Sequence, residues 1–224
     1  MQAGNVTYRS ARDIPDIVPV FPLAGALLLP GGQMPLNIFE PRYLEMIDTA
    51  LRGDRLIGMI QPKFSGDTGH PDRPTLCAVG CLGRIASFAE SGDGRYLLSL
   101  QGVCRFRVAE ELSMRTPFRQ CRITPFGSDL DDSVDAAACV NREELLRVFR
   151  AYLDANELEA DWDSVQRAGN ETLVNALSMM SPYGPAEKQA LLEAPDLKSR
   201  AETLIAITEM ALARDKEDFG KTLQ

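Results

Sequence analysis

The stretch FPLAGALLLPGGQMPLNIFEPRY, from Phe21 to Tyr43, decides how this chain folds. Three interpretations of it compete: a signal sequence or membrane anchor, a catalytic loop built around Gly-Gly-Gln, and the edge of a folded core. Prolines at positions 19, 22, 30 and 35 break the region, and its longest unbroken apolar run, Leu23 to Leu29, has only seven residues. A membrane-spanning helix needs about 20 apolar residues. The stretch is therefore not expected to cross a membrane.

The residues before this stretch carry both signs of charge, with two arginines and two aspartates (Arg9, Arg12, Asp13 and Asp16). A secretory signal would begin with a positively charged segment followed by an apolar run. We therefore expect a cytoplasmic protein without a membrane partner.

The Gly-Gly-Gln motif at Gly31 to Gln33 resembles the glutamine loop with which peptide release factors hydrolyse peptidyl-tRNA. That loop has to be exposed, whereas apolar residues flank the motif here, at Leu27–Pro30 and Met34–Leu36. A glycine turn or bulge between two strand segments explains the pattern more simply. The sequence predicts a structural role for the motif.

Composition and charge are those of a globular protein with two different parts. The 224 residues are 45% hydrophobic and 25% charged, which is ordinary for a folded chain. Residues 1–125 carry 14 Lys and Arg against 12 Asp and Glu, whereas residues 126–224 carry 10 against 20. No strongly basic face is available to neutralise phosphates, which argues against a dedicated nucleic-acid binder.

The first part of the chain is dominated by strand patterns. Short apolar runs punctuated by Pro and Gly predict strands at Ile17–Leu23, Ala26–Phe39, Arg55–Pro62, Leu76–Ala89, Arg95–Leu112 and Phe118–Phe126. One helix is expected to begin at Pro41 and to end at Gly53. In the strand VCRFRV, Cys104 and Phe106 should face the core, while Arg105 and Arg107 should face solvent.

The second part has helical patterns throughout. An acidic linker, GSDLDDSVDAA, is followed by apolar residues at helical spacing around residues 145–153 and 173–180, and by a last helix with Asp196 as its N-cap. These patterns predict an α+β fold in which a β-rich part precedes a helical bundle.

The sequence offers few groups for catalysis or metal binding. The five cysteines (Cys77, Cys81, Cys104, Cys121 and Cys139) lack disulfide or zinc spacing and indicate reduced thiols in a protein core. The single histidine, His70, restricts nucleophile–histidine pairs. Ser199 beside Lys198 does not make a dyad, because adjacent helical residues point about 100° apart. We expect no metal, no cofactor and no enzymatic activity.

Three segments resemble the amino-terminal, substrate-binding domain of Lon proteases. They are FPLAGALLLPGGQMPLNIFEPRYLEMIDTAL, VGCLGRIASFAESGDGRYLLSLQGVCRFRV and ETLVNALSMMSPYGPAEKQALLEAPDLKSRAETLIAI, in the family's order. The resemblance spans Ile17 to Leu212. It implies a β-rich PUA-like pseudo-barrel over residues 1–126 and an α-helical bundle over residues 127–224.

The resemblance also implies a function. In the full protease this domain precedes an ATPase module and a Ser–Lys peptidase module, and the chain ends before either one could begin. We therefore expect a stand-alone, non-catalytic module that recognises unfolded or partly folded polypeptide or a protein partner, acting as an adaptor in protein quality control.

Candidate binding residues are apolar or aromatic side chains near loops, where function concentrates. They are Met34, Leu36, Phe39, Tyr43, Phe64 and Tyr183. For the first four, burial in the core is the competing interpretation.

Two other functions stay open. PUA-like barrels resemble RNA-binding modules, and six arginines of the β-rich part suit phosphate contacts (Arg84, Arg95, Arg105, Arg107, Arg119 and Arg122). The acidic pI of about 4.8 weighs against this alternative. A hydrolytic or small-molecule enzyme is the third function, and no motif supports it.

Overall fold

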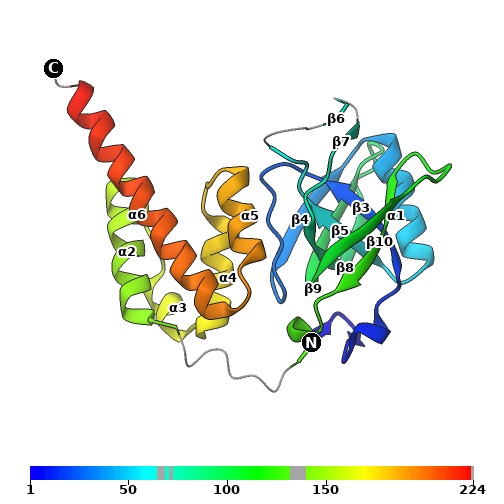
Figure 1. Cartoon of the computed structure of the whole chain (residues 1–224), viewed down its shortest axis with the longest axis horizontal. Helices are drawn as coiled ribbons and strands as arrows, with labels where there is room; N and C mark the ends of the chain where they lie inside the picture. The colour runs from blue at the N-terminus through cyan, green and yellow to red at the C-terminus, as the bar shows by residue number, and fades with distance from the viewer. Residues whose placement is uncertain (65–68, 71–72, 132–139, 223–224) are drawn as a thin grey trace. The chain divides into compact units, whose positions relative to one another are not determined.

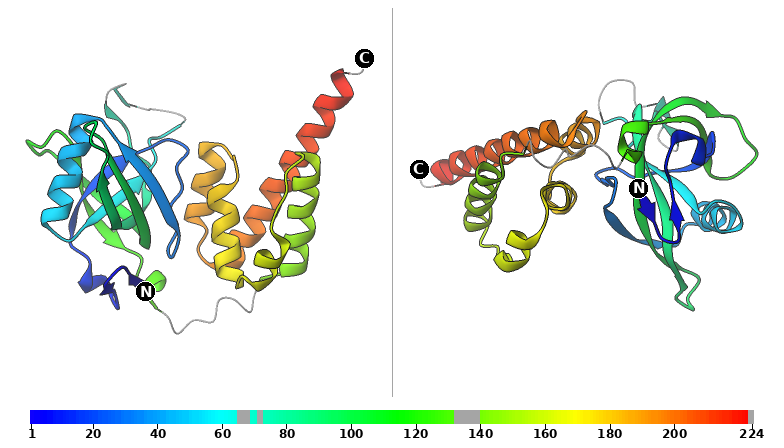
Figure 2. Two further views of the ribbon diagram at one scale, coloured as in Figure 1. Left: turned by 180° about the vertical axis from the view of Figure 1, so that it is seen from behind. Right: turned by 90° about the horizontal axis from the view of Figure 1, so that it is seen from below.

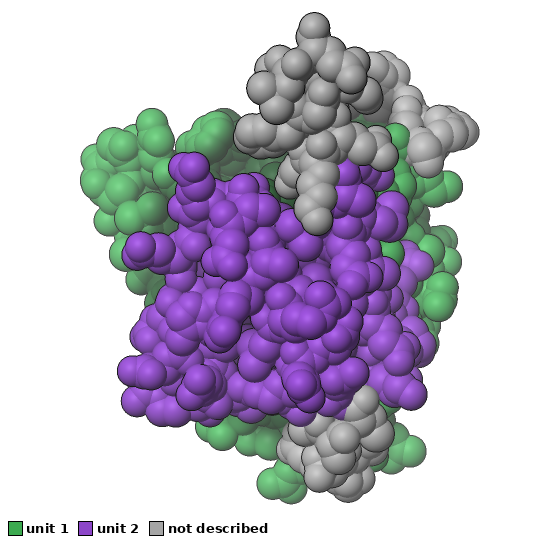
Figure 3. Space-filling view, turned by 90° about the vertical axis from the view of Figure 1, so that its left-hand side faces the viewer, with its two compact units in different colours: residues 1–134, 182–192 green, residues 135–181, 193–224 purple. Residues whose placement is uncertain are grey.

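The computed structural model describes residues 1–64, 69–70, 73–131 and 140–222. Contacts within the chain divide it into two compact units, shown in Figure 3. The barrel unit comprises residues 1–134 and 182–192, and the helical unit comprises residues 135–181 and 193–224. The domain boundary predicted between residues 126 and 127 stays a prediction.

The barrel unit is built on a six-stranded sheet. Its strands are β3 (Ile17–Pro22), β4 (Gln33–Ile38), β5 (Leu56–Ile60), β8 (Val79–Glu90), β9 (Tyr96–Leu112) and β10 (Arg119–Pro125). The strand order is β10-β3-β5-β8-β9-β4, and a further pairing between β10 and β9 closes the sheet into a ring (Figure 1). The pairing of β3 with β5 is parallel and the others are antiparallel.

The long strand β9 makes the closure possible. Its first half pairs with β4, where Leu100 lies opposite Met34, and its second half pairs with β10, where Arg107 lies opposite Thr124. Phe106 is fully buried, and its phenyl group lies against two glycines, Gly58 and Gly80. A side chain at either position would collide with Phe106, so the two glycines make room for the largest fully buried side chain among the described residues.

Helix α1 (Pro41–Arg52) lies on the outside of this ring (Figures 1 and 2). Pro41 occupies the first turn, where its missing N–H costs nothing, and Gly53 follows the last residue. The helix predicted between these two residues is confirmed. Short elements complete the ring's periphery: β1 (Gln2–Ala3), β2 (Val6–Thr7), β6 (Gly69–His70), β7 (Arg73–Pro74), and the 3-10 turns η1 (Ala11–Asp13) and η2 (Gly127–Leu130).

Helix α5 (Pro185–Glu193) is distant from the strands in sequence, but its residues up to Leu192 belong to the barrel unit. Buried glutamines attach it there. Gln61 Nε2 donates to the Pro185 carbonyl (3.0 Å) and to Gln189 Oε1 (3.1 Å). Gln189 Nε2 in turn donates to the Val79 carbonyl (3.1 Å). These bonds satisfy polar groups that would otherwise be buried without partners.

The helical unit contains α2 (Arg142–Ala155), α3 (Trp162–Arg167), α4 (Asn170–Met180) and α6 (Leu197–Thr222). Figure 2 shows α2 running beside α6, and Arg147 on α2 forms ion pairs with Glu144 and Glu209. Asp196 accepts a hydrogen bond from the Ser199 backbone N–H (2.8 Å), as expected of the predicted N-cap. The α+β fold, a pseudo-barrel followed by helices, is confirmed.

The Gly-Gly-Gln motif forms a turn that leads into β4. Gly31 has φ of 76°, a backbone conformation that glycine adopts readily. Gly31 N–H donates to the Gly102 carbonyl (3.0 Å), and Gly102 N–H donates to the Gly32 carbonyl (2.8 Å). The predicted turn is confirmed. The strand predicted over the three leucines before it is wrong: Leu27–Leu29 are buried, but they lie in a loop.

Arg105 was expected to face solvent, and this expectation is wrong. Its side chain is only 3% exposed. Nε and Nη2 donate to the two carboxylate oxygens of Asp129 (2.8 and 2.7 Å), and Nη1 donates to the Leu192 carbonyl (3.3 Å). The sequence places Asp129 in an acidic linker, but its side chain is only 8% exposed. A buried cation needs such a partner, because burial strips it of its hydration.

Gly102 generates a first testable prediction. A Cβ at this position would collide with the backbone carbonyl oxygen of Leu29, which cannot rotate away. We expect Gly102→Ala to lower the free energy of unfolding by about 3 kcal/mol, as overpacked cores do. Gly127→Ala is the control, because its Cβ would meet nothing within 4 Å. Urea denaturation measures both, and equal stabilities would contradict the prediction.

The Arg105–Asp129 pair generates a second prediction. Asp129→Ala leaves a buried guanidinium without its carboxylate and should cost about 3–5 kcal/mol of stability. Glu110→Ala removes the carboxylate of the exposed pair with Arg122 and should change stability by no more than about 1 kcal/mol. Unfolding midpoints of the two variants are compared, and a similar loss in both would refute a special role for the buried pair.

Candidate functional site

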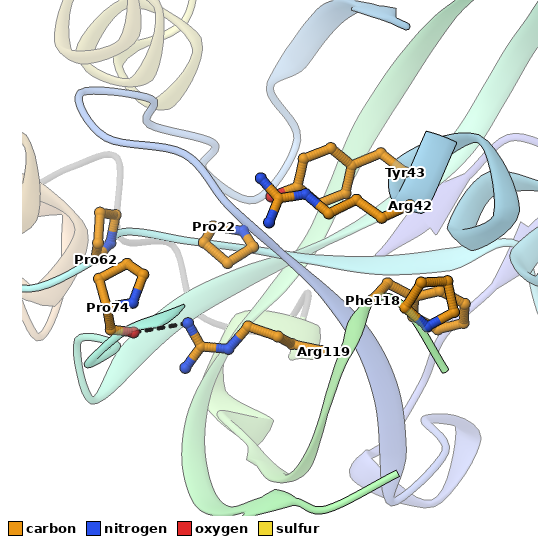
Figure 4. Close-up of a pocket in the computed structure, with 8 residues that line it drawn as sticks. Pro22, Arg42, Tyr43, Pro62, Pro74, Phe118 and Arg119 are labelled. Carbon is orange, nitrogen blue, oxygen red and sulfur yellow. Dashed lines mark hydrogen bonds between the residues drawn. The ribbon is translucent and has the colours of Figure 1, made fainter. Parts of the chain in front are cut away.

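A pocket of about 250 Å³ lies at the surface of the barrel unit (Figure 4). Residues from the end of β3, the first turn of α1, the segment after β5, β7 and the start of β10 surround it. They are Pro22, Arg42, Tyr43, Pro62, Pro74, Pro117, Phe118 and Arg119. Four of the eight are prolines, whose rings give rigid apolar walls without backbone donors.

The IFEPRY segment places two of these residues. Pro41 sets the first helical position, so Arg42 and Tyr43 project from the opening turn of α1. The ring of Tyr43 packs against Phe21, with centroids 4.3 Å apart and an angle of 49° between the planes. Tyr43 is only 7% exposed. Its position is therefore fixed by the core rather than by the surface.

The two arginines of the pocket differ in how they are held. Arg119 donates hydrogen bonds from Nε and Nη2 to the Glu111 carboxylate. Its Nη1 donates to the Pro74 carbonyl (2.7 Å), a bond drawn in Figure 4. Arg73 Nη2 also donates to Glu111 (2.7 Å). Arg119 is thus part of the wall.

Arg42 is less constrained. Its Nε donates to Glu40 Oε2 (2.9 Å), and its Nη2 lies 2.8 Å from the same oxygen. Among the described residues, Nη1 has no acceptor. The guanidinium carbon lies 4.6 Å from the centre of the Tyr43 ring, within the range of a cation–π contact, and the side chain is 45% exposed. Arg42 therefore keeps donor capacity at the pocket.

Protonation states at the pocket follow from burial and from the arginines. Burial raises the pKa of Tyr43, so its hydroxyl stays neutral at physiological pH and can donate a hydrogen bond. Burial alone would raise the pKa of Glu111, but hydrogen bonds from Arg119 and then Arg73 outweigh it and lower this pKa. Glu111 is therefore ionised at neutral pH.

The pocket is chemically suited to binding. Its eight residues include no Ser, Cys, His, Asp or Glu, so they supply neither a usual nucleophile nor a carboxylate base. Within the described part of the chain, no three His, Cys, Asp or Glu side chains are grouped to hold a metal ion. Cys77, Cys81, Cys104 and Cys121 are buried free thiols, and Cys139 lies outside the described residues. Burial, with Asp129 adding to it, raises the pKa of Cys104 to about 12.

Of the six binding residues predicted from the sequence, Tyr43 alone lines the pocket. Met34 and Leu36 are half-buried on β4, and Tyr183 is half-buried in the segment before α5. Phe39 is 62% exposed and lies under Arg95, while Phe64 is 48% exposed. The role of all six in binding stays a prediction.

Sequence reasoning missed most of the pocket. Arg42 adjoins Tyr43 in the IFEPRY segment, and this neighbourhood was the one usable signal. Pro22 and Pro62 entered the sequence analysis only as residues that interrupt or end an apolar run, and Pro74 and Pro117 gave no signal of a site, because the convergence of the four depends on the closure of the ring.

Comparison with known proteins identifies the family. The sequence profile of the ATP-dependent protease La (LON) substrate-binding domain matches residues 17–209. The chain belongs to the Lon substrate-binding domain family. Among its relatives, Lon protease 2 of Myxococcus xanthus is 28% identical over 203 residues, covering 88% of this chain and 24% of that protein. Lon protease of Parabacteroides distasonis is 30% identical over 195 residues, covering 86% and 24%.

Solved structures agree with this assignment at the level of fold. The Lon N-terminal domain protein from Xanthomonas campestris has a TM-score of 0.61 and 23% identity, covering 85% of this chain and 97% of that one. The N-terminal domain of the Mycobacterium avium complex Lon protease has a TM-score of 0.63 and 21% identity, covering 86% and 98%. This Lon-type chain spans about a quarter of the length of the curated proteases it matches. No helix in the described residues is long and apolar enough to span a membrane.

Glu111 gives a pH-dependent prediction for this Lon-type domain. Its folded-state pKa lies below the ordinary value of 4.5, so its ionised form stabilises the fold above about pH 4.5, and this contribution is lost as the pH falls through the lowered pKa. Glu111→Gln should therefore be less stable than the wild type at pH 7, with a difference that shrinks towards pH 3. Urea unfolding at several pH values measures the difference, with the exposed Glu110→Gln as control. A stability difference between Glu111→Gln and the wild type that does not change with pH would contradict a lowered pKa of Glu111.

Proposed function

We propose that this chain recognises unfolded or partly folded polypeptide without catalysing a reaction on it. Membership of the Lon substrate-binding domain family supports this class of ligand. The single observation that carries the proposal is the pocket: it combines rigid proline and aromatic rings with a larger polar surface that provides hydrogen-bond donors, and no usual nucleophile lines it. Such a site holds a ligand and leaves it unchanged.

Exposed aromatic residues lie close in sequence to the pocket residues. Phe39 precedes Arg42 by three residues, and Phe64 follows Pro62 by two. Both side chains are largely exposed, although burying a phenylalanine is favourable by about 1.5–3 kcal/mol. An extended chain that places one side chain in the pocket gains further contacts from such residues. Unfolded polypeptide offers these side chains, whereas a folded protein has buried most of them.

RNA binding is the less favoured function. Five of the six arginines considered for phosphate contact already bond within the fold, namely Arg84, Arg95, Arg105, Arg119 and Arg122. Arg107 lies over Phe126, at 5.8 Å from its ring centre. Phosphate contacts need cations that are free to replace the counterions of the nucleic acid.

We further propose that the chain acts as an adaptor in protein quality control, delivering bound polypeptide to a separate protease. The family's place in ATP-dependent proteases supports this role. Affinity purification from the native cell, with mass spectrometry of the bound proteins, tests it. An ATP-dependent protease among them is expected, and its absence after crosslinking argues against an adaptor.

Binding to an unfolded polypeptide tests the main proposal. The chain should bind reduced, carboxymethylated α-lactalbumin and should bind the native, disulfide-bonded protein much more weakly. The double variant Phe39→Ser/Phe64→Ser should bind several-fold more weakly, since each substitution removes an exposed apolar contact. Met210→Ser, an exposed apolar residue of the helical unit, is the matched control.

Biolayer interferometry measures these affinities, and circular dichroism verifies that the variants are folded. Equal binding to the unfolded and native forms would refute the proposal. Retention on immobilised RNA that falls steeply with salt would favour the alternative function instead.

A further inference from the structure

We propose that the pocket captures the C-terminal residue of a polypeptide, with its α-carboxylate on Arg42 and the Tyr43 hydroxyl and with a large apolar side chain between the proline walls. This inference rests on the proposed function and names the part of the polypeptide that the pocket reads. Four observations carry it: the donors of Arg42, the hydroxyl of Tyr43, the charge of the lining, and the size of the cavity.

The guanidinium of Arg42 is positioned and incompletely used. Glu40 holds Nε and Nη2 through one carboxylate oxygen, and the ring of Tyr43 lies under the guanidinium at 4.6 Å. Nη1 has no acceptor among the described residues, and nearly half of the side chain is exposed. The ion pair with Glu40 and the contact with the Tyr43 ring restrict this guanidinium, which lowers the side-chain entropy lost when a carboxylate binds.

The hydroxyl of Tyr43 is the second donor. The residue as a whole is more than nine-tenths buried, and no described residue hydrogen-bonds to its hydroxyl. No buried side-chain oxygen of the described residues lacks a partner, so this hydroxyl is accessible from the cavity. Figure 4 shows this oxygen on the same side of the pocket as the Arg42 guanidinium. A tyrosine hydroxyl at the mouth of an apolar body can donate to a ligand that enters. A ligand oxygen at this position supplies the acceptor.

The charge of the lining selects an anion. Two guanidiniums and no carboxylate line the cavity, in a chain whose net charge is −8. Behind the wall, Arg73 and Arg119 share the single carboxylate of Glu111, and Glu40 faces Arg42. The three guanidiniums thus exceed the two carboxylates around the site. A positively charged N-terminal amine is disfavoured there, and a carboxylate is favoured.

The size of the cavity decides between a terminal and an internal carboxylate. About 250 Å³ is below the range of about 300–1,000 Å³ for pockets that enclose drug-sized ligands, so the cavity suits about one residue. The donors and the apolar walls therefore have to be reached from the same Cα atom. In an extended chain, neighbouring side chains point to opposite sides, and the next on the same side is about 7 Å away. A C-terminal residue carries its carboxylate and its side chain on one Cα atom.

Fluorescence anisotropy with labelled octapeptides tests the inference. The first peptide has seven Gly and Ser residues followed by a C-terminal phenylalanine with a free carboxylate. The second differs only in a C-terminal amide, and the third is amidated and carries Phe-Asp internally. We expect the free acid to bind about tenfold or more tightly than either of the others, as the loss of a charged hydrogen bond implies. Equal binding of the amide, or of the internal Phe-Asp peptide, overturns the inference.

Variants locate the interaction. Arg42→Gln should weaken binding of the free acid about tenfold and leave the amide unchanged. Tyr43→Phe keeps the packing on Phe21 and removes only the hydroxyl, so a loss of several-fold is expected while the protein stays folded. Arg52→Gln is the matched control, since it removes the same charge from an exposed position at the other end of α1. An Arg42 variant that binds the free acid like the control overturns the assignment.

The outcome separates this inference from the function it rests on. If unfolded α-lactalbumin binds and blocking its C-terminal carboxylate as an amide changes nothing, the chain recognises polypeptide elsewhere and the inference is wrong. If neither the unfolded protein nor any peptide binds, the proposed function is wrong as well. Binding of the free-acid peptide that is lost on amidation and in Arg42→Gln supports both.

Discussion

The buried pair of Arg105 and Asp129 is the constraint on which the barrel unit depends. The carboxylate accepts hydrogen bonds from the Arg105 side chain and also from its backbone N–H (2.8 Å), so η2 is fixed against β9. The remaining guanidinium nitrogen donates to the Leu192 carbonyl and brings the end of α5 to the same place. Because a guanidinium without partners is costly to bury, these three segments have to arrive together.

The closure of the ring connects this constraint to the pocket. Strand β9 carries Arg105 and pairs through its second half with β10, where Gln120 lies opposite Leu112. β10 begins with Arg119, which reaches the Pro74 carbonyl and Glu111. The part of the pocket wall that β10 supplies is therefore an extension of the same hydrogen-bonded ring.

The sequence predicts the elements better than their meeting points. Apolar periodicity predicts α1 and the long strands. A helix that buries one face has apolar residues at a period of 3.6, and a strand that buries one face has them at a period of 2. The same alternation wrongly placed Arg105 on the solvent side. The pattern within one strand carries no information about Asp129, whose carboxylate lies 24 residues further along the chain. Leu27–Leu29 have the composition of a strand, but within the described part of the chain no strand pairs with them, and their side chains fill the core from a loop. The pocket was missed for a related reason. Its prolines are ordinary turn residues singly, and only the closure of the ring brings them together.

The pocket combines two kinds of group with different physical properties. Proline walls and a buried aromatic face bind apolar groups with little regard to sequence, because the hydrophobic effect is not directional. A guanidinium and a phenol are directional and accept only certain geometries. Under the proposed function, combining the two would let one site tolerate many polypeptides while fixing the direction in which each chain lies. A site of about 250 Å³ also limits affinity, since few atoms are buried, and a bound chain can therefore leave again.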